Sequence, residues 1–168
     1  MAINQMSQAP PAEQKGSKVL IGTGDNRLQD AVYRDGTIWA AASDACMPPG
    51  DSQIRACARF IELTAAGKEQ DFDLGQAGAY YFDPAVEIVP DPSPIVGGND
   101  LIAAFNRSSA KEHVSVVASG RRERQDPPNT LRIPVLVKAG EASYLVSATN
   151  GVDRNWGDYS GAGFDPLR

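Results

Sequence analysis

The chain has 168 residues, of which 42% are hydrophobic and 22% charged, and its formal net charge at neutral pH is −5. This length and composition are those of one globular domain with a hydrophobic core. The acidic balance excludes non-specific binding of nucleic acid, which requires a basic surface. No apolar run approaches the ~20 residues that a membrane-spanning helix needs.

The first 17 residues differ in composition from the rest of the chain. Residues 1–17, MAINQMSQAPPAEQKGS, are polar, contain proline and show no periodicity, so they predict a disordered leader. They lack the apolar centre of a secretory signal peptide. Either the mature protein stays inside the cell, or the sequence lacks its true start.

The next part of the chain has the periodicity of strands rather than helices. The predicted strands are a short run at 18–24, a pair at 27–43 that turns at Asp35-Gly36, and a pair at 58–74 that turns at Ala66-Gly67. An Asp-Gly step between two apolar runs is a strong signal for a β-hairpin. We therefore expect a group of antiparallel strands joined by tight turns.

A second group of strands follows. Its members are predicted at 79–89, 100–108, 113–121 and 131–139, and the loop 90–99 between the first two contains three prolines and two glycines. Pro134 has no N–H group to donate to a neighbouring strand, so the last run should be an edge strand. The predicted fold class is all-β.

The two groups resemble each other, which predicts an internal repeat. Asp30–Tyr33 aligns with Pro84–Glu87, and Ile38–Ala41 aligns with Leu101–Ala104. The repeated units span about 18–76 and 77–145, and 156–165 reads as the start of a third unit. Units of about 50 residues with about four strands are typical of propeller blades. We therefore expect a partial β-propeller of antiparallel four-stranded blades within 18–168, with chance similarity or a β-sandwich as the alternatives.

Several short motifs carry a family resemblance. They are RLQDAVYRDG (27–36), YYFDPAV (80–86), FNRSS (105–109), SGR (119–121), DPPNTL (126–131), KAGEASY (138–144) and WGDYSG (156–161). On these motifs the chain resembles a group of poorly characterised, mostly secreted bacterial propeller-like proteins, which are distantly similar to the sialidase-type propellers. The resemblance implies a propeller fold and an extracellular or periplasmic location. It transfers no catalytic residues.

Two units and a fraction of a third do not close a propeller ring. Sheet edges beside Pro134 or Phe164 would then remain open, and open edges pair readily with other chains. The chain is then a fragment of a longer propeller, a part that forms a homo-oligomer through open sheet edges, or a protein that folds differently from the group.

The two cysteines, Cys46 and Cys57, have neither the CxxC spacing nor the clustered histidines of a zinc site. The favoured interpretation is a disulfide that closes the loop between them, which would stabilise the fold by about 3 kcal/mol. Two free, buried thiols are the alternative.

A carboxylate recurs at the start of the first strand of each unit, at Asp30, Asp83 and Asp158. If the units surround a common axis, these three carboxylates converge, and a cation such as calcium would relieve their repulsion. The alternative is that each aspartate accepts hydrogen bonds from backbone N–H groups in a local turn.

Arginines and aromatic residues suggest a ligand site. Arg107 and Arg121 could pair with a carboxylate of a sugar, and Trp156 and Tyr159, with Asp158 between them, could contact a sugar ring. Solvated loop charges explain the arginines equally well. Aromatic residues at strand spacing, which also include Trp39, Tyr80 and Tyr81, more often pack in the core.

Catalytic patterns are weak in this sequence. His113 is the sole histidine, and neither Ser109 nor Ser115 lies in a GxSxG motif. Asp158 and Tyr159 are adjacent, so in a strand their side chains point to opposite faces. The sequence therefore favours a non-catalytic module that binds a glycan or a protein. A fragment of a sialidase-like glycoside hydrolase is the alternative.

Overall fold

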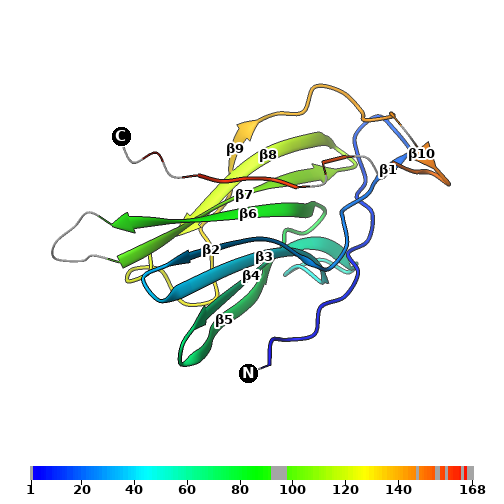
Figure 1. Ribbon diagram of the computed structural model, residues 1–168. Coiled ribbons are helices and arrows are strands. Elements are labelled where there is room, and N and C mark those ends of the chain that lie inside the picture. Colours follow the sequence, from blue (N-terminus) through cyan, green and yellow to red (C-terminus); the bar gives the residue numbers. More distant parts are fainter. Residues whose placement is uncertain are drawn as a thin grey trace.

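A computed structural model of the chain describes residues 2–91, 98–146, 148–153, 156–157, 159–163 and 165 (Figure 1). The first sheet contains β2 (Leu28–Arg34), β3 (Thr37–Cys46), β4 (Arg55–Thr64) and β5 (Gly67–Leu74). The second sheet contains β6 (Tyr80–Asp91), β7 (Gly98–Ser109), β8 (Glu112–Arg121) and β9 (Val135–Lys138). A small sheet joins β1 (Leu20–Ile21), β11 (Val152–Asp153) and β10 (Ala148–Thr149) in that order. The prediction of an all-β fold is confirmed.

Both large sheets are antiparallel and keep their strands in chain order. The turn between β2 and β3 lies at Asp35 and Gly36, whose φ angles are 48° and 86°. Positive φ at both central positions gives a turn whose twist matches that of the flanking strands. Asp-Gly tolerates this geometry, which is why the hairpin could be predicted from sequence.

The edge position of the last strand was also predicted. β9 begins directly after Pro134 and pairs with β8 at the edge of the second sheet. It is shorter than the predicted run 131–139. The described part of the chain contains no helix of the length and apolarity required to cross a membrane.

The main core lies between the two large sheets. Trp39, Ala41 and Phe60 of the first sheet face Tyr81 and Phe105 of the second. Ring centroids of Phe60 and Phe105 are 6.5 Å apart, and those of Tyr81 and Phe105 are 5.0 Å apart. Each of these large side chains contributes about 1.5–3 kcal/mol by leaving water. Their contacts hold the sheets together.

The strand β6 makes the main contacts of the second sheet with the first, because it lies against β2, β3 and β4. Figure 1 shows β2 and β6 next to each other, with β5 and β9 at the far edges. Each of these first strands contains a bulge, between Leu28 and Asp30 in β2 and between Phe82 and Ala85 in β6.

The bulges reveal an error in the predicted repeat. The sequence alignment set Ala31 beside Ala85 and Ala41 beside Ala104. In the structure Ala41 pairs with Asp30, whereas Ala104 pairs with Ala85. The aligned first strands are therefore one residue out of register, because an irregularity in pairing leaves no trace in the apolar pattern.

The predicted disordered leader is wrong for residues 2–17, which pack against the sheets. Ala9 and Ala12 are buried, and Ala12 exchanges two backbone hydrogen bonds of 2.8 Å with Ile21. The buried amide of Gln14 donates to the carbonyl groups of Val19 and Tyr144. These polar residues are ordered because distant parts of the chain satisfy their hydrogen bonds, which local composition does not report.

A disulfide joins Cys46, the last residue of β3, to Cys57 in β4, with 5.8 Å between their Cα atoms. Gly75 lies beside it, and a Cβ atom at that position would stand 2.8 Å from Cys57 Sγ. The disulfide therefore leaves no room for a side chain at residue 75, so glycine is required there.

Replacing both cysteines by serine should lower the free energy of unfolding by about 3 kcal/mol, because the open loop gains conformational entropy in the unfolded state. For a chain of this size we expect Tm to fall by about 6–12 °C in thermal denaturation. Wild-type protein kept reduced is the control and should have the same Tm as the double variant. Equal Tm values for oxidised wild type and the variant would contradict the role of the bridge.

Candidate functional site

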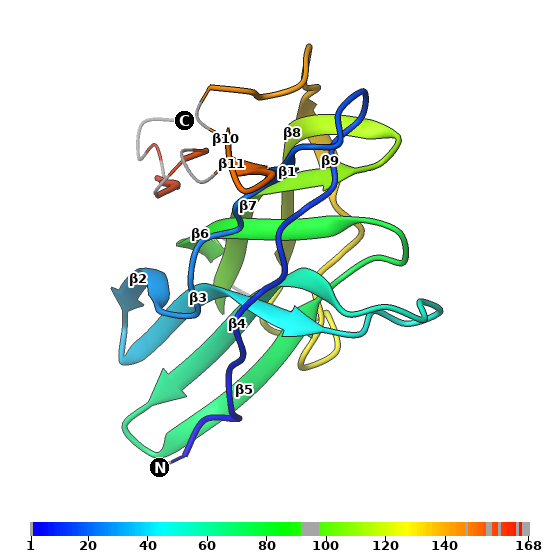
Figure 2. The same cartoon turned by 90° about the vertical axis from the view of Figure 1, so that its right-hand side faces the viewer.

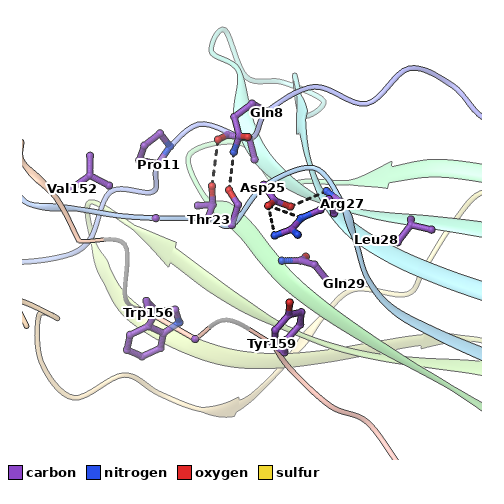
Figure 3. Close-up of a pocket in the computed structure, with 14 residues that line it drawn as sticks. Gln8, Pro11, Thr23, Asp25, Arg27, Leu28, Gln29, Val152, Trp156 and Tyr159 are labelled. Atoms are coloured by element: carbon purple, nitrogen blue, oxygen red, sulfur yellow. Dashed lines mark hydrogen bonds and ion pairs between the residues drawn. The ribbon is translucent and has the colours of Figure 1, made fainter. Parts of the chain in front are cut away.

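A pocket with a volume of about 610 Å³ lies where three segments meet (Figure 3). These segments are the N-terminal residues 8–11, the connection from β1 to β2 with the start of β2, and β11 with the residues that follow it. The lining residues are Gln8, Ala9, Pro11, Gly22, Thr23, Gly24, Asp25, Arg27, Leu28, Gln29, Val152, Trp156, Gly157 and Tyr159. The pocket therefore brings together residues from both ends of the sequence.

Trp156 and Tyr159 form the aromatic side of this pocket (Figure 3). Trp156 packs edge-on against Tyr144, with 5.0 Å between the ring centroids, and it borders a small core cluster around Ile21 and Phe82. Its orientation is thus fixed by packing. Tyr159 is 71% exposed, and its hydroxyl group points toward Gln29 (Figure 3). A ligand in the pocket would meet one fixed and one accessible aromatic ring.

An ion pair lies across the pocket from these rings. Arg27 and Asp25 approach within 2.6 Å, and the Asp25 carboxylate also accepts the Arg27 backbone N–H. The side-chain hydrogen bond from Arg27 is the main reason that the pKa of Asp25 is lowered. Both groups are exposed and charged, so they are available to polar groups of a ligand.

Gln29 is held in the pocket wall by a buried network. Its amide donates to Asp83 Oδ1 at 2.9 Å, and its amide oxygen accepts the Ser43 hydroxyl at 3.0 Å. The backbone N–H of Asp83 in turn donates to Ser43 Oγ at 3.0 Å. Three side chains from β2, β3 and β6 therefore fix one another, and the pocket receives a preorganised amide group.

Asp83 itself has an unusual backbone. It lies in the β6 bulge with a φ of 50° and is 1% exposed. A non-glycine residue in this region costs about 1–3 kcal/mol and persists where the surroundings over-determine it. Gly24 completes the arrangement, since a Cβ atom there would lie 2.8 Å from Gln29 Nε2 and 3.2 Å from Asp83 Oδ1.

The predicted calcium ligands take other roles where they are described. Asp30 accepts the Val86 backbone N–H at 2.8 Å and so connects β2 to β6. Asp83 accepts hydrogen bonds from Gln29 and Asn106. Asp158 lies outside the described residues. In the described ranges no group of three His, Cys, Asp or Glu residues could hold a metal ion.

The two predicted anion-binding arginines do not line the pocket. Arg107 makes two hydrogen bonds of 2.8 Å to Glu112. Arg121 is 5% exposed, lies over the Trp39 ring at 6.0 Å and donates to the carbonyl group of Asp126. A partner five residues further along the chain thus engages each guanidinium group, and Arg121 also contacts the distant Trp39.

Core packing also explains the other aromatic candidates. Trp39, Tyr80 and Tyr81 are buried, and the guanidinium carbon of Arg55 lies 4.8 Å from the centroid of the Tyr80 ring. In the described chain no serine hydroxyl bonds to the His113 side chain. Ser115 donates to the His113 carbonyl group and accepts the Gly140 N–H.

Of the residues that line the pocket, the sequence analysis named Trp156 and Tyr159 as ligand-binding candidates but did not name Asp25, Arg27 or Gln29. The signal for Asp25 and Arg27 was the stretch GTGDNR at 22–27, a polar, glycine-containing run directly before an apolar strand. Together the fold and the pocket define an all-β protein with a ligand-sized pocket beside its N-terminal residues. Comparisons with protein-family models, curated proteins and solved structures found no match.

The hydrogen-bond network behind Gln29 should contribute to the stability of the fold. Asp83→Ala should lower the free energy of unfolding by about 1–3 kcal/mol, because it leaves buried donors unpaired and keeps the strained φ. Asp83→Asn is the matched control, since asparagine tolerates positive φ and still accepts one hydrogen bond. Chemical denaturation measures both. If the alanine variant were as stable as wild type, the network would make no contribution to the free energy of unfolding.

Proposed function

We propose that the chain is a non-catalytic binding module of propeller-like architecture and that it takes a glycan ligand in the pocket beside Trp156 and Tyr159. The observation that carries this proposal is the meeting of two aromatic rings with the Asp25–Arg27 pair and the fixed amide of Gln29 in about 610 Å³. Sugars present apolar ring faces and many hydroxyl groups. Aromatic rings beside a few well-placed polar groups suit such a ligand.

The propeller-like part of the proposal is supported by the sheets. Both run up and down in chain order, and both begin with a bulged strand. β6 makes the main contacts with the first sheet, whereas the sheets of a β-sandwich pack over the faces of several strands from each. The segment proposed to begin a third unit lies at the pocket, beside residues that precede β2.

The non-catalytic part is supported by the carboxylates. Glycoside hydrolysis generally needs two carboxyl groups that flank the scissile bond. Asp25 is the one carboxylic acid among the described lining residues, and Arg27 engages it. This arrangement favours binding over the alternative of a sialidase-like hydrolase fragment.

An extracellular or periplasmic location belongs to the same proposal. The Cys46–Cys57 disulfide supports it, because disulfides persist mainly in oxidising compartments.

The glycan proposal is tested with a glycan array, followed by calorimetric titration of the best ligand. Trp156→Ala should weaken binding at least about tenfold, or ~1.4 kcal/mol, because it removes the fixed ring. Trp156→Phe should restore part of the affinity and also controls for lost packing. Tyr33→Ala is the matched control, since Tyr33 is an exposed tyrosine that does not line the pocket.

Two results would count against this assignment. One is unchanged affinity in Trp156→Ala, which would place the ligand elsewhere. The other is turnover of a fluorogenic glycoside that Tyr159→Phe or Asp25→Asn abolishes, which would establish the hydrolase alternative.

We also propose that copies of the chain associate through β9. This edge strand exposes Val135, Leu136 and Val137, and exposed apolar edge strands are templates for pairing. Light scattering should show a mass that rises with concentration. Val137→Lys should remain monomeric, whereas Ile54→Lys, in an exposed loop, should behave as wild type. A wild-type monomer at all concentrations would refute the association.

A further inference from the structure

The N-terminal residues 2–8, here called the strap, cross the outer face of the first sheet. Figure 2 shows this segment passing across β4 and beside β5. Ile3, Asn4, Gln5 and Ser7 are exposed, although their backbone is held against the sheet. Burial of these side chains therefore does not account for the attachment of the strap to the sheet.

The strap lies over a buried cluster of charges. Arg59 of the central strand β4 is 3% exposed and lies between Asp44 of β3 and Asp71 of β5. Arg59 Nη1 is 2.6 Å from Asp44 Oδ2, and Arg59 Nη2 donates to Asp71 Oδ1. Lys68 adds a second cation 3.1 Å from Asp71. The three buried groups therefore bind one another across three adjacent strands.

The side chains of the cluster bind the main chain of the strap. The Asn4 N–H donates to Asp71 Oδ2 at 2.7 Å, and the Ser7 N–H donates to Asp44 Oδ1 at 2.7 Å. Arg59 donates to the carbonyl groups of Asn4 at 3.2 Å and Gln5 at 3.5 Å. Asp44, Arg59 and Asp71 thus each contact the strap backbone directly.

The strap also influences the charges beneath it. Burial alone would raise the pKa of Asp71, but the hydrogen bonds from the Asn4 N–H, Lys68 and Arg59 lower it overall. Asp71 therefore stays ionised as an acceptor for an N–H group. Hydrogen bonds to ionised groups contribute about 1.5–3 kcal/mol each before the entropy of ordering the segment is subtracted.

Main-chain recognition implies limited dependence on side-chain identity. Every non-proline residue carries the same N–H and C=O groups, so another extended segment could satisfy the same contacts. A segment that fits the cluster supplies an N–H and a C=O group at the position of Asn4. It supplies a C=O group at the position of Gln5 and an N–H group at the position of Ser7. Asn4 adds a side-chain contact to Lys68 at 3.3 Å, which favours a polar residue at its own position.

We propose that the cluster of Asp44, Arg59 and Asp71 is a binding site for an extended polypeptide segment of another chain, and that the strap occupies it as a tethered competitor. None of these three residues lines the glycan pocket, although Gln8 at the end of the strap does, and the proposal does not depend on the proposed glycan function. Because a short tether gives an effective concentration of about millimolar, a free peptide competes poorly until the strap is weakened.

The test leaves the cluster unchanged and alters only the strap. A fluorescent peptide with the sequence of residues 2–9, AINQMSQA, is titrated into full-length chains, and fluorescence anisotropy is recorded. Ser7→Pro removes the N–H that donates to Asp44, so this chain should bind the peptide at least about tenfold more tightly than Ser7→Ala, which keeps that donor. A double variant, Asn4→Pro with Ser7→Pro, should bind the peptide at least as tightly as Ser7→Pro.

A second peptide tests the mode of recognition. Proline in place of its serine should weaken binding to the Ser7→Pro chain at least about tenfold, because the peptide then lacks the same N–H. The proposal is overturned if the double variant binds no peptide up to ~1 mM or binds it no better than Ser7→Ala. Equal affinity for the serine and proline peptides would overturn main-chain recognition and the site with it.

Discussion

The attachment of β6 to the first sheet is the contact on which the rest of the structure depends. Two aspartates secure it with hydrogen bonds between strands of different sheets. Asp30 accepts the Val86 N–H, and Asp83 binds Gln29 while its own N–H donates to Ser43. The aromatic core around Phe60 and Phe105 supplies the larger part of the free energy, but it is not directional. The aspartates set the position of β6, and through Gln29 they also shape the pocket.

This division explains which features the sequence revealed. The Asp35-Gly36 hairpin and the edge position beside Pro134 follow from local backbone chemistry, so the sequence alone predicted them. The bulge at Asp83 and the stacking of Arg121 on Trp39 depend on residues distant in the chain. No pattern within one segment encodes such partners. The same limit applied to the pocket, where the aromatic residues were predicted but the Asp25–Arg27 pair was not.

The N-terminal residues show the limit of composition most clearly. A polar segment with prolines predicts disorder because it cannot bury enough apolar surface to offset its lost entropy. Residues 2–17 meet that cost in a different way, with hydrogen bonds to groups that the rest of the fold has already fixed. Gln14 bridges two distant carbonyl groups, and Arg59 with its aspartates holds the backbone of the strap. The N-terminal residues are therefore ordered by groups elsewhere in the fold, and the sequence of the segment alone does not reveal those groups.

The two proposed sites differ in what they recognise, and the difference follows from where their polar groups lie. The pocket presents rings and exposed side chains whose shape selects among ligands, so changes to Trp156 or Gln29 would alter specificity. The cluster around Arg59 presents buried charges to a backbone that all polypeptides share. Selectivity there must come from the extended conformation and from exclusion of proline at the donor positions. None of the three cluster residues lines the pocket, but Gln8 at the end of the strap does, so displacement of the strap would also change one side of the pocket.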